Sequence, residues 1–404
     1  MNPFAYLRKK GFVGTIQVIW RYKLPKLQVA LLSRLTREMP LKNKIVIESH
    51  DDFDCNGGAL YNYLIEHGYN KRIKIVWRLY HPLDTVLPDN VEVVPLYGPS
   101  WRKAWHVCTA KWFTADCTVV DRVRDDQISL YMTHGIFGLK NFKGLADTPP
   151  SVTDYLSPSC RMDEILSDMK GMTGGQIRML HLGFPVLDRL YANEYSKGYL
   201  RQEDSRPMFL WMPTFRKGIV SGRTDAEGEY PYGVALIDDS NTLEGLATHL
   251  RRNNARMVIK LHPKEDLSIL ARNSLVGVSD VITMIAGDMM SGADADNHDL
   301  MLDSIALITD YSGIVFEYLA LDRPVAFDLS DIKRYKIGLI PNSDRYMPGQ
   351  KIDDYSGLCD FIEDVCRGND AYAQDRRSFC SWFFDHEDSS ASERIVDYLG
   401  MNDL

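Results

Sequence analysis

Three basic side chains suited to proton or phosphoryl transfer each follow an apolar, strand-like run. His134 follows ISLYMT, Arg216 ends WMPTFR, and His262 follows VIKL. In open α/β sheets the carboxyl ends of the strands face the ligand crevice, so we expect these side chains to line it. A histidine can take a proton from an alcohol, and a guanidinium fork can hold phosphate oxygens. The set indicates transfer chemistry on a phosphorylated substrate.

A fourth segment, residues 305–328, has the pattern of a phosphate-binding βα unit. An apolar run ends at Thr309, and apolar residues then recur at helical spacing. Asp310 or Ser312 would cap the helix. Gly313 has no side chain at the helix start, so a phosphate could lie against free backbone N–H groups there. The alternative is an ordinary capped crossover without a ligand.

The elements that must position these residues alternate between strand-like and helical runs. From Lys44 the order is KIVIES, ALYNYLIEHG, IKIVWRLY, VEVVPL and ISLYMT, and a second set begins at Pro207 with MFLWMP and continues through RMVIKL, DVITMI, SIALIT and PVAFDL. Such alternation predicts parallel sheets with helices on both faces. The polar stretch between Tyr191 and Pro207 is the expected boundary between two Rossmann-like halves.

In this order, the four segments resemble motifs of the CDP-glycerol glycerophosphotransferase family, which includes teichoic-acid primases and polymerases and some capsule enzymes. The resemblance covers roughly residues 45–400. It implies an α/β protein of GT-B architecture, with two Rossmann-like domains facing a central cleft and a basic N-terminal helical segment. The expected parts are a membrane-associating segment (1–43), an acceptor domain (44–195), a CDP-donor domain (206–375) and a C-terminal helix bracing the first domain (376–404).

The resemblance implies that His134 is the base that activates the acceptor hydroxyl. The chain departs from the family here, because it reads THGIFGLK where family members usually read WHGTPLK, so it has one extra residue and lacks the threonine and the proline. The acceptor side is therefore open to difference. The alternative is a structural histidine that holds the turn.

On the donor side, the resemblance assigns His262 to the pyrophosphate and the leaving CMP, and Arg216 to phosphate oxygens. The predicted donor-binding residues are Thr214, Arg216, Thr309, Asp310, Ser312, Gly313 and Glu317. Glycine replaces the second serine of the family's TDYSS at position 313. An exposed helical glutamate is the alternative for Glu317, and a surface ion pair is the alternative for Arg216.

The loop after the first strand, HDDFDCNGG, could approach the acceptor. Its candidate residues are His50, Asp51 and Asn56, with Gly135 from the later turn. Capping and turn formation explain the same residues. The acidic stretch 294–299 lacks the glycine and glutamate of a calcium loop, so we predict no metal site and no cofactor beyond the CDP-activated substrate.

Charge is distributed unevenly along the 404 residues. Residues 1–44 carry ten Lys or Arg against one acid, a charge of +9, whereas the remainder, with 37 basic and 54 acidic residues, is −17. The acidic body excludes nucleic-acid binding, while a basic head rich in aromatic and aliphatic residues suits an anionic membrane surface. Its apolar run is too short to span a bilayer, and the alternative is a helix packed on the enzyme itself. The seven cysteines show no zinc-finger spacing and suit reduced thiols.

The function expected from these features is transfer of glycerol phosphate, or another alditol phosphate, from its CDP-activated form to a lipid-linked saccharide or growing polymer, with release of CMP. The enzyme would work at the cytoplasmic face of the plasma membrane. The rivals are a CDP-ribitol enzyme, a GT-B glycosyltransferase that uses a nucleotide sugar, and a non-catalytic scaffold that binds lipid phosphate. Oligomeric state stays open.

Overall fold

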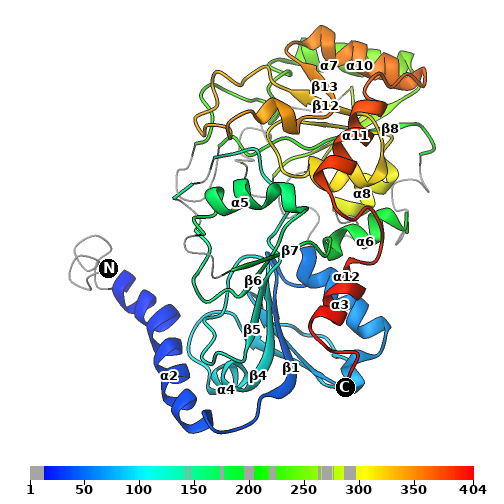
Figure 1. The fold of residues 1–404 in the computed structure, drawn as a ribbon. Helices are drawn as coiled ribbons and strands as arrows, with labels where there is room; N and C mark the ends of the chain where they lie inside the picture. The colour runs from blue at the N-terminus through cyan, green and yellow to red at the C-terminus, as the bar shows by residue number, and fades with distance from the viewer. Residues whose placement is uncertain are drawn as a thin grey trace. The chain divides into compact units, whose positions relative to one another are not determined.

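The computed structural model describes residues 13–141, 143–144, 147–172, 177–194, 204–217, 224–262, 265, 275, 277–285 and 297–404. The chain forms two compact units, and each contains one parallel sheet (Figure 1). Unit 1 comprises residues 1–134, 143–188 and 388–404, and unit 2 comprises 135–142 and 189–387.

Unit 1 contains a seven-stranded sheet in the order β3-β2-β1-β4-β5-β6-β7. Its strands are β1 (Lys42–Glu48), β2 (Lys74–Leu79), β3 (Val91–Pro95), β4 (Ala110–Ala115), β5 (Ile128–Tyr131), β6 (Asp154–Leu156) and β7 (Arg178–Leu180). All neighbours pair in parallel. β1 and β2 read as near-continuous buried runs, which is typical of strands covered on both faces. Chain order reverses between β1 and β4.

Beyond its N-terminal helix, the described part of unit 1 contains several further helices. They are α3 (Cys55–Glu66), α4 (Trp101–Thr109), α5 (Asp163–Met169) and α12 (Ala391–Tyr398), with α6 (Pro185–Tyr191) at the boundary and short 3-10 turns η2 (Tyr69–Lys71) and η3 (Cys160–Met162). The C-terminal α12 packs against α3. Asp188 fixes it there, because its carboxylate accepts the backbone N–H groups of Ala391 and Ser392 at 2.8 and 2.9 Å.

Unit 2 contains a six-stranded parallel sheet in the order β10-β9-β8-β11-β12-β13. The strands are β8 (Met208–Trp211), β9 (Arg256–Lys260), β10 (Ile282–Ile285), β11 (Ala306–Thr309), β12 (Val325–Asp328) and β13 (Gln350–Ile352). The helices are α7 (Ser240–Arg252), α8 (Asn297–Asp303), α9 (Val315–Tyr318), α10 (Tyr355–Cys366) and α11 (Ala373–Phe383), with 3-10 turns η6 (Leu319–Leu321) and η7 (Ser343–Tyr346). Chain order reverses between β8 and β11.

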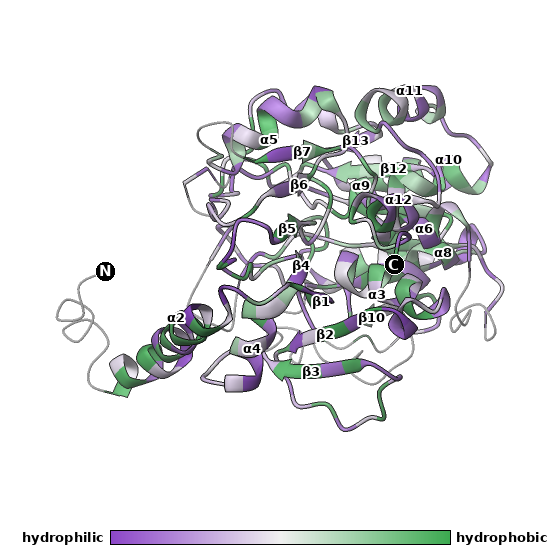
Figure 2. Ribbon diagram, turned by 60° about the horizontal axis from the view of Figure 1, so that its bottom comes forward, coloured by the Kyte–Doolittle hydropathy of each residue, from purple (hydrophilic) through white to green (hydrophobic). Residues whose placement is uncertain are grey.

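The basic N-terminal segment is helical from residue 13, through the π-helical turn η1 (Ile19–Lys23) into α2 (Leu24–Thr36). It docks on unit 1: Arg21 lies 3.5 Å above the Tyr97 ring, and Lys26 pairs with Asp121 at 2.7 Å. A stripe of apolar side chains on this helix nevertheless stays exposed, namely Val13, Ile16, Ile19, Trp20, Leu24, Leu27, Leu31 and Leu35. Figure 2 shows hydrophobic and hydrophilic residues alternating along the helix. Within the described residues, no helix is both long and apolar enough to cross a bilayer.

The division of the chain differs from the predicted one in three places. The boundary lies at 188/189, so residues 189–195 of the predicted acceptor domain belong to unit 2. Residues 135–142 belong to unit 2, although they follow the unit 1 strand β5 directly. The predicted bracing segment 376–404 is split, because α11 lies in unit 2 and only α12 joins unit 1. None of the seven cysteines, all of them in described ranges, forms a disulfide.

Candidate functional site

Three loops at the carboxyl edge of the unit 1 sheet bring chemically useful side chains together. His50 follows β1, Cys117 follows β4 and His134 follows β5, and these three strands are neighbours. The order of the strands along the chain reverses between β1 and β4, and open α/β sheets bind ligands at such a switch point. One ligand atom from each residue lies within 4.8 Å of those of the other two.

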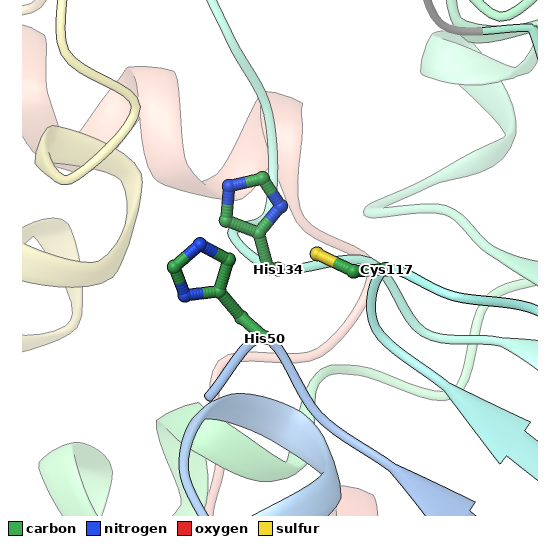
Figure 3. A group of neighbouring side chains, drawn as sticks. All are labelled: His50, Cys117 and His134. Carbon is green, nitrogen blue, oxygen red and sulfur yellow. The ribbon is translucent and has the colours of Figure 1, made fainter. Parts of the chain in front are cut away.

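His134 presents an exposed imidazole from a tight turn. The residue before it, Thr133, has φ 65°, and Gly135 has φ 100°. Residues other than glycine rarely adopt a positive φ, so the conformation of Thr133 must be held in place by its surroundings. The His134 ring stacks on the His50 ring, with centroids 4.6 Å apart and an interplanar angle of 14° (Figure 3). The structure thus brings together two histidines that the sequence analysis proposed separately.

Asn56 is the group that holds this turn. Its side chain is fully buried, and its Nδ2 donates to the carbonyls of Thr133 at 2.9 Å and Met132 at 3.3 Å. Its Oδ1 accepts the N–H of Val186 at 3.1 Å. Because the Asn56 side chain is buried, it cannot contact a substrate directly, although it was predicted on the acceptor side. It positions His134 instead.

The acidic loop before α3 forms internal contacts. The exposed Asp51 donates its N–H to Asp54 Oδ1 at 2.9 Å, and His50 Nδ1 lies 3.7 Å from Asp54 Oδ2. Burial raises the pKa of Asp54, but the His50 imidazole, the Asp51 N–H and the Ser49 hydroxyl outweigh it and leave this pKa below its ordinary value. Asp54 is therefore a carboxylate that can orient the His50 imidazole.

Two buried acids fix the loop that carries Cys117. Glu48 accepts the backbone N–H groups of Asp116, Cys117 and Thr118 at 3.2, 3.0 and 2.8 Å. Asp116 accepts the Gly57 N–H in the first turn of α3 at 2.8 Å. Burial raises the pKa of both acids. The first turn of α3 is thus already engaged by a carboxyl group of the protein.

In unit 2, Arg216 lies at the centre of a buried network. Its guanidinium contacts Asp310 at 2.7 Å and Asp331 at 2.8 Å and is 1% exposed. The rings of Tyr230, Tyr311 and Tyr335 lie 5.6, 5.7 and 5.7 Å from it. Burial lowers the pKa of Arg216, but the two carboxylates outweigh burial and raise it. The geometry does not support the predicted direct contact with donor phosphate, nor a surface ion pair, because the fork is buried on protein carboxylates.

Three other predicted donor residues stabilise the same turns. The backbone N–H of Thr214 donates to both oxygens of Asp310, at 3.0 and 2.9 Å, and its hydroxyl donates to the same carboxylate. The Thr309 hydroxyl donates to the Met212 carbonyl at 2.8 Å. All three side chains are buried. They tie the loop after β8 to the loop after β11, and their geometry leaves phosphate contact to other groups.

The structure explains why position 313 is a glycine, which the sequence alone did not. A Cβ at this position would lie 2.4 Å from the carbonyl oxygen of Phe137. The predicted side-chain cap is wrong as well: α9 starts at Val315, its N-cap is Ile314, and neither Asp310 nor Ser312 caps it. The half-buried Ser312 hydroxyl lies 3.4 Å from the Ile314 N–H. Close approach of the 135–141 segment thus explains the glycine.

Glu317 and His262 complete the predicted set. Glu317 is buried and its Oε2 lies 2.9 Å from His298 Nε2, so the alternative of an exposed helical glutamate is wrong. His262 follows β9, is half-buried, and packs near the Phe215 ring at a centroid distance of 5.7 Å. Its neighbours Pro263 and Lys264, and Asp294 and Asp296 of the acidic stretch, lie outside the described residues.

Four further residues of these networks were not predicted as site residues from the sequence, namely Cys117, Glu48, Asp116 and Asp331. Each of them lies at or just after the carboxyl end of a strand, so the signal that found the histidines applies to them too. Each unit thus carries an imidazole at the carboxyl edge of its own sheet, His134 in unit 1 and His262 in unit 2, beside buried networks that hold the loops. This arrangement suits a transfer reaction in which the protein positions groups and moves one proton.

Comparison with known proteins agrees with this chemistry. Residues 31–400 match the family described as CDP-Glycerol:Poly(glycerophosphate) glycerophosphotransferase. The chain is 23% identical to the teichoic acid glycerol-phosphate transferase of Staphylococcus aureus (strain NCTC 8325 / PS 47), over 90% of this chain and 94% of the relative. It is 23% identical to the teichoic acid ribitol-phosphate primase of Bacillus spizizenii (strain ATCC 23059 / NRRL B-14472 / W23), over 81% of this chain and 74% of the relative.

Among solved structures, the wall teichoic acid polymerase TagF (variant H548A) is similar with a TM-score of 0.70 and 19% identity, covering 100% of this chain and 98% of that one. This likeness shows the fold. With the two parallel sheets, it confirms the predicted α/β GT-B class.

Proposed function

The chain belongs to the CDP-glycerol:poly(glycerophosphate) glycerophosphotransferase family, and from this premise we propose which reaction it catalyses. It transfers glycerol phosphate from CDP-glycerol to a hydroxyl of a lipid-linked saccharide or growing polymer and releases CMP. The observation that carries the proposal is the exposed His134 imidazole at the carboxyl edge of the unit 1 sheet, on a turn held by Asn56.

In the proposed mechanism, His134 accepts the proton of the acceptor hydroxyl as its oxygen attacks the phosphorus next to glycerol. The new P–O bond forms, and the bond from that phosphorus to the CMP phosphate oxygen breaks. His262 and the Ser312 hydroxyl are the half-buried donor-side groups assigned to the leaving CMP. Phosphoryl transfer needs mainly positioning and charge neutralisation, so no covalent intermediate is required.

The donor assay separates this proposal from its rivals. Calorimetric titration with CDP-glycerol, CDP-ribitol and UDP-glucose is run beside a CMP-release assay on a lipid-linked disaccharide. CMP release with CDP-glycerol supports the proposal. Release with CDP-ribitol alone favours the second candidate, to which the ribitol-phosphate relative points. Binding of the UDP-sugar alone would instead indicate a glycosyltransferase, and donor binding without turnover a scaffold.

Variants test the assigned roles. General bases typically contribute about 10²–10⁴-fold to rate, so His134→Ala should lower turnover by about that factor while CDP-glycerol affinity stays nearly constant. His262→Ala should lower turnover and, unlike His134→Ala, should also weaken CDP-glycerol binding. If His134→Ala abolished donor binding in a folded protein, the assignment of the two units to acceptor and donor would be wrong.

We also propose that the enzyme works at an anionic membrane surface on the cytoplasmic side. The support is the exposed apolar stripe of the N-terminal helix, which lies in a segment of charge +9. Replacing Leu27 and Leu31 by Gln should reduce co-sedimentation with anionic vesicles at least about tenfold, because each buried leucine is worth about 1.5–3 kcal/mol. Val86→Gln, which replaces an exposed apolar residue outside the helix, is the matched control. Equal sedimentation of all three proteins would refute the stripe's role.

A further inference from the structure

We infer that His50, Cys117 and His134 form a binding site for a soft divalent cation such as Zn²⁺. Each residue offers one ligand atom, and the three atoms lie within 4.8 Å of one another. Figure 3 shows the Cys117 thiol directed toward the two imidazoles. Imidazole nitrogen and thiolate sulfur are the ligands that Zn²⁺ prefers, and zinc sites with three protein ligands commonly take water as the fourth.

The ligand-bearing backbone is already fixed. The Cys117 N–H donates to the buried Glu48 carboxylate at 3.0 Å, and the Thr133 carbonyl next to His134 accepts from Asn56 at 2.9 Å. Zinc bonds of about 2.0–2.3 Å place tetrahedral ligand atoms roughly 3.3–3.6 Å apart. The ligand atoms, now within 4.8 Å of one another, must therefore come about 1 Å closer. Since His50 and His134 are exposed, rotation of their side chains can move the ligand atoms by that distance.

A carboxylate lies next to one of the ligands, His50, as is common in metal sites. Asp54 Oδ2 lies 3.7 Å from His50 Nδ1. This separation is longer than a hydrogen bond. Closing it to hydrogen-bond distance would orient the imidazole and make its other nitrogen a stronger ligand. His50 would then bind the cation through that other ring nitrogen, Nε2. The pair Asp54–His50 thus supplies an observation independent of the distances among the ligand atoms.

Two thiols compete for this role, and the geometry distinguishes them. Cys55 forms a second group with His50 and Asp54, whereas Cys117 forms the group that includes both histidines. Two imidazoles and one thiolate make the better zinc site, so we assign Cys117 as the sulfur ligand. No metal site was predicted from the sequence, because the three residues lie on loops far apart along the chain.

Occupancy has a functional consequence. A cation bound by His134 takes the lone pair that the proposed mechanism uses to accept the acceptor's proton. Zn²⁺ should therefore inhibit the transferase reversibly. This consequence rests on the proposed function, whereas the binding site itself does not.

The binding test uses the full chain treated with chelator and titrated with Co²⁺, without substrate. A tetrahedral site with a thiolate gives a near-ultraviolet charge-transfer band and intense visible bands, and Zn²⁺ competition then gives the zinc affinity. Cys117→Ser should abolish the charge-transfer band and weaken Zn²⁺ binding by more than about 100-fold, while Cys55→Ser should leave both intact. His50→Ala should weaken binding with the thiolate band reduced.

Absence of the band in the wild-type chain, or its loss in Cys55→Ser but not in Cys117→Ser, would overturn the site. In the CMP-release assay, Zn²⁺ should inhibit the wild type and EDTA should reverse the inhibition. Cys117→Ser should need at least about tenfold more Zn²⁺ for the same fractional inhibition. A chain that binds Co²⁺ through Cys117 but releases no CMP from any CDP-alditol would keep the site and sink only the proposed function.

Discussion

At the scale of single residues, the turn that carries His134, the proposed base, depends on a buried amide side chain. Asn56→Ala removes the two donors that hold the Thr133 and Met132 carbonyls. Misplacing a reacting group by about 1 Å can cost on the order of 10²-fold, so we expect kcat to fall by about 10–100-fold. Affinity for CDP-glycerol should hardly change, because Asn56 lies in unit 1.

Asn70→Ala is the matched control for this prediction. Asn70 is also a buried asparagine of unit 1, and its Nδ2 donates to the Asp89 carbonyl at 3.0 Å. Both variants lose a buried side-chain hydrogen bond, which typically costs about 1–3 kcal/mol of stability. Only Asn56→Ala should lower kcat. An equal loss in both folded variants would reduce Asn56 to a general stability role.

A second residue-scale prediction concerns Asp328 at the end of β12. Burial, together with Asp310 and Asp331, raises its pKa to about 7. Because this value lies above the unfolded value, the folded state holds the proton longer, and stability falls as pH rises from about 4 to 7. Asp328→Asn mimics the neutral acid and should be more stable than the wild type at pH 8, by up to about 4 kcal/mol, but not at pH 4.

Urea unfolding at both pH values checks this. The exposed Asp353→Asn is the control and should show no such pH-dependent gain. If Asp328→Asn were equally destabilising at pH 4 and pH 8, the carboxylate would be ionised and its charge favourable.

The sequence predicted which strand ends carry polar side chains but not which of those side chains stay accessible. Strand ends are visible in the apolar pattern, so His134 and His262 were placed correctly after β5 and β9. Arg216 carries the same signal, yet its partner Asp331 is distant along the chain and no local pattern reports that pairing. Arg216→Ala should therefore disrupt folding of unit 2 before it affects donor affinity, since it leaves buried carboxylates unpaired.

At the scale of elements, the turn before α9 is shaped by a neighbouring segment. Gly313→Ala would place a Cβ 2.4 Å from the Phe137 carbonyl oxygen, and a backbone atom cannot move aside cheaply. We expect a stability loss of about 1–3 kcal/mol and weaker donor binding, as the Ser312 turn shifts. Urea unfolding and titration with CDP-glycerol measure the two effects.

Gly138→Ala, in the same segment, provides the comparison. An added Cβ at Gly138 meets no atom within 4 Å, so its effect should stay within about 0.5 kcal/mol. Should Gly313→Ala be tolerated as well as Gly138→Ala, the close approach would not constrain the turn.

At the scale of the whole molecule, the chain passes from unit 1 into unit 2 immediately after His134. Leu139 accepts the N–H of Ile340 at 2.9 Å, and Asn141 donates to the Gly338 carbonyl at 2.8 Å. The Phe137 ring packs 5.2 Å from Phe316 in unit 2. The alternation of strands and helices predicted two Rossmann-like halves. It did not predict that residues 135–142 belong to unit 2, because that assignment depends on tertiary packing. The same segment is where the sequence departs from the family pattern.

This connection makes Phe137 a test of whether the segment after His134 helps to hold the His134 turn. Phe137 packs among Phe316, Tyr346 and Phe383, and it lies three residues from His134. Phe137→Ala should lower stability by about 3–5 kcal/mol and should also reduce kcat, because the turn loses its anchor. Phe379→Ala removes another ring of the same cluster, packed 5.2 Å from Phe383, without touching the 135–141 segment.

Both variants should therefore lose stability in urea unfolding, but only Phe137→Ala should lose turnover at a temperature where both stay folded. Equal turnover in the two variants would mean that the His134 turn is held from unit 1 alone, through Asn56. In that case combining Asn56→Ala with Phe137→Ala would add nothing to the kcat loss of Asn56→Ala. If both anchors act, the double variant should lose more than either single one.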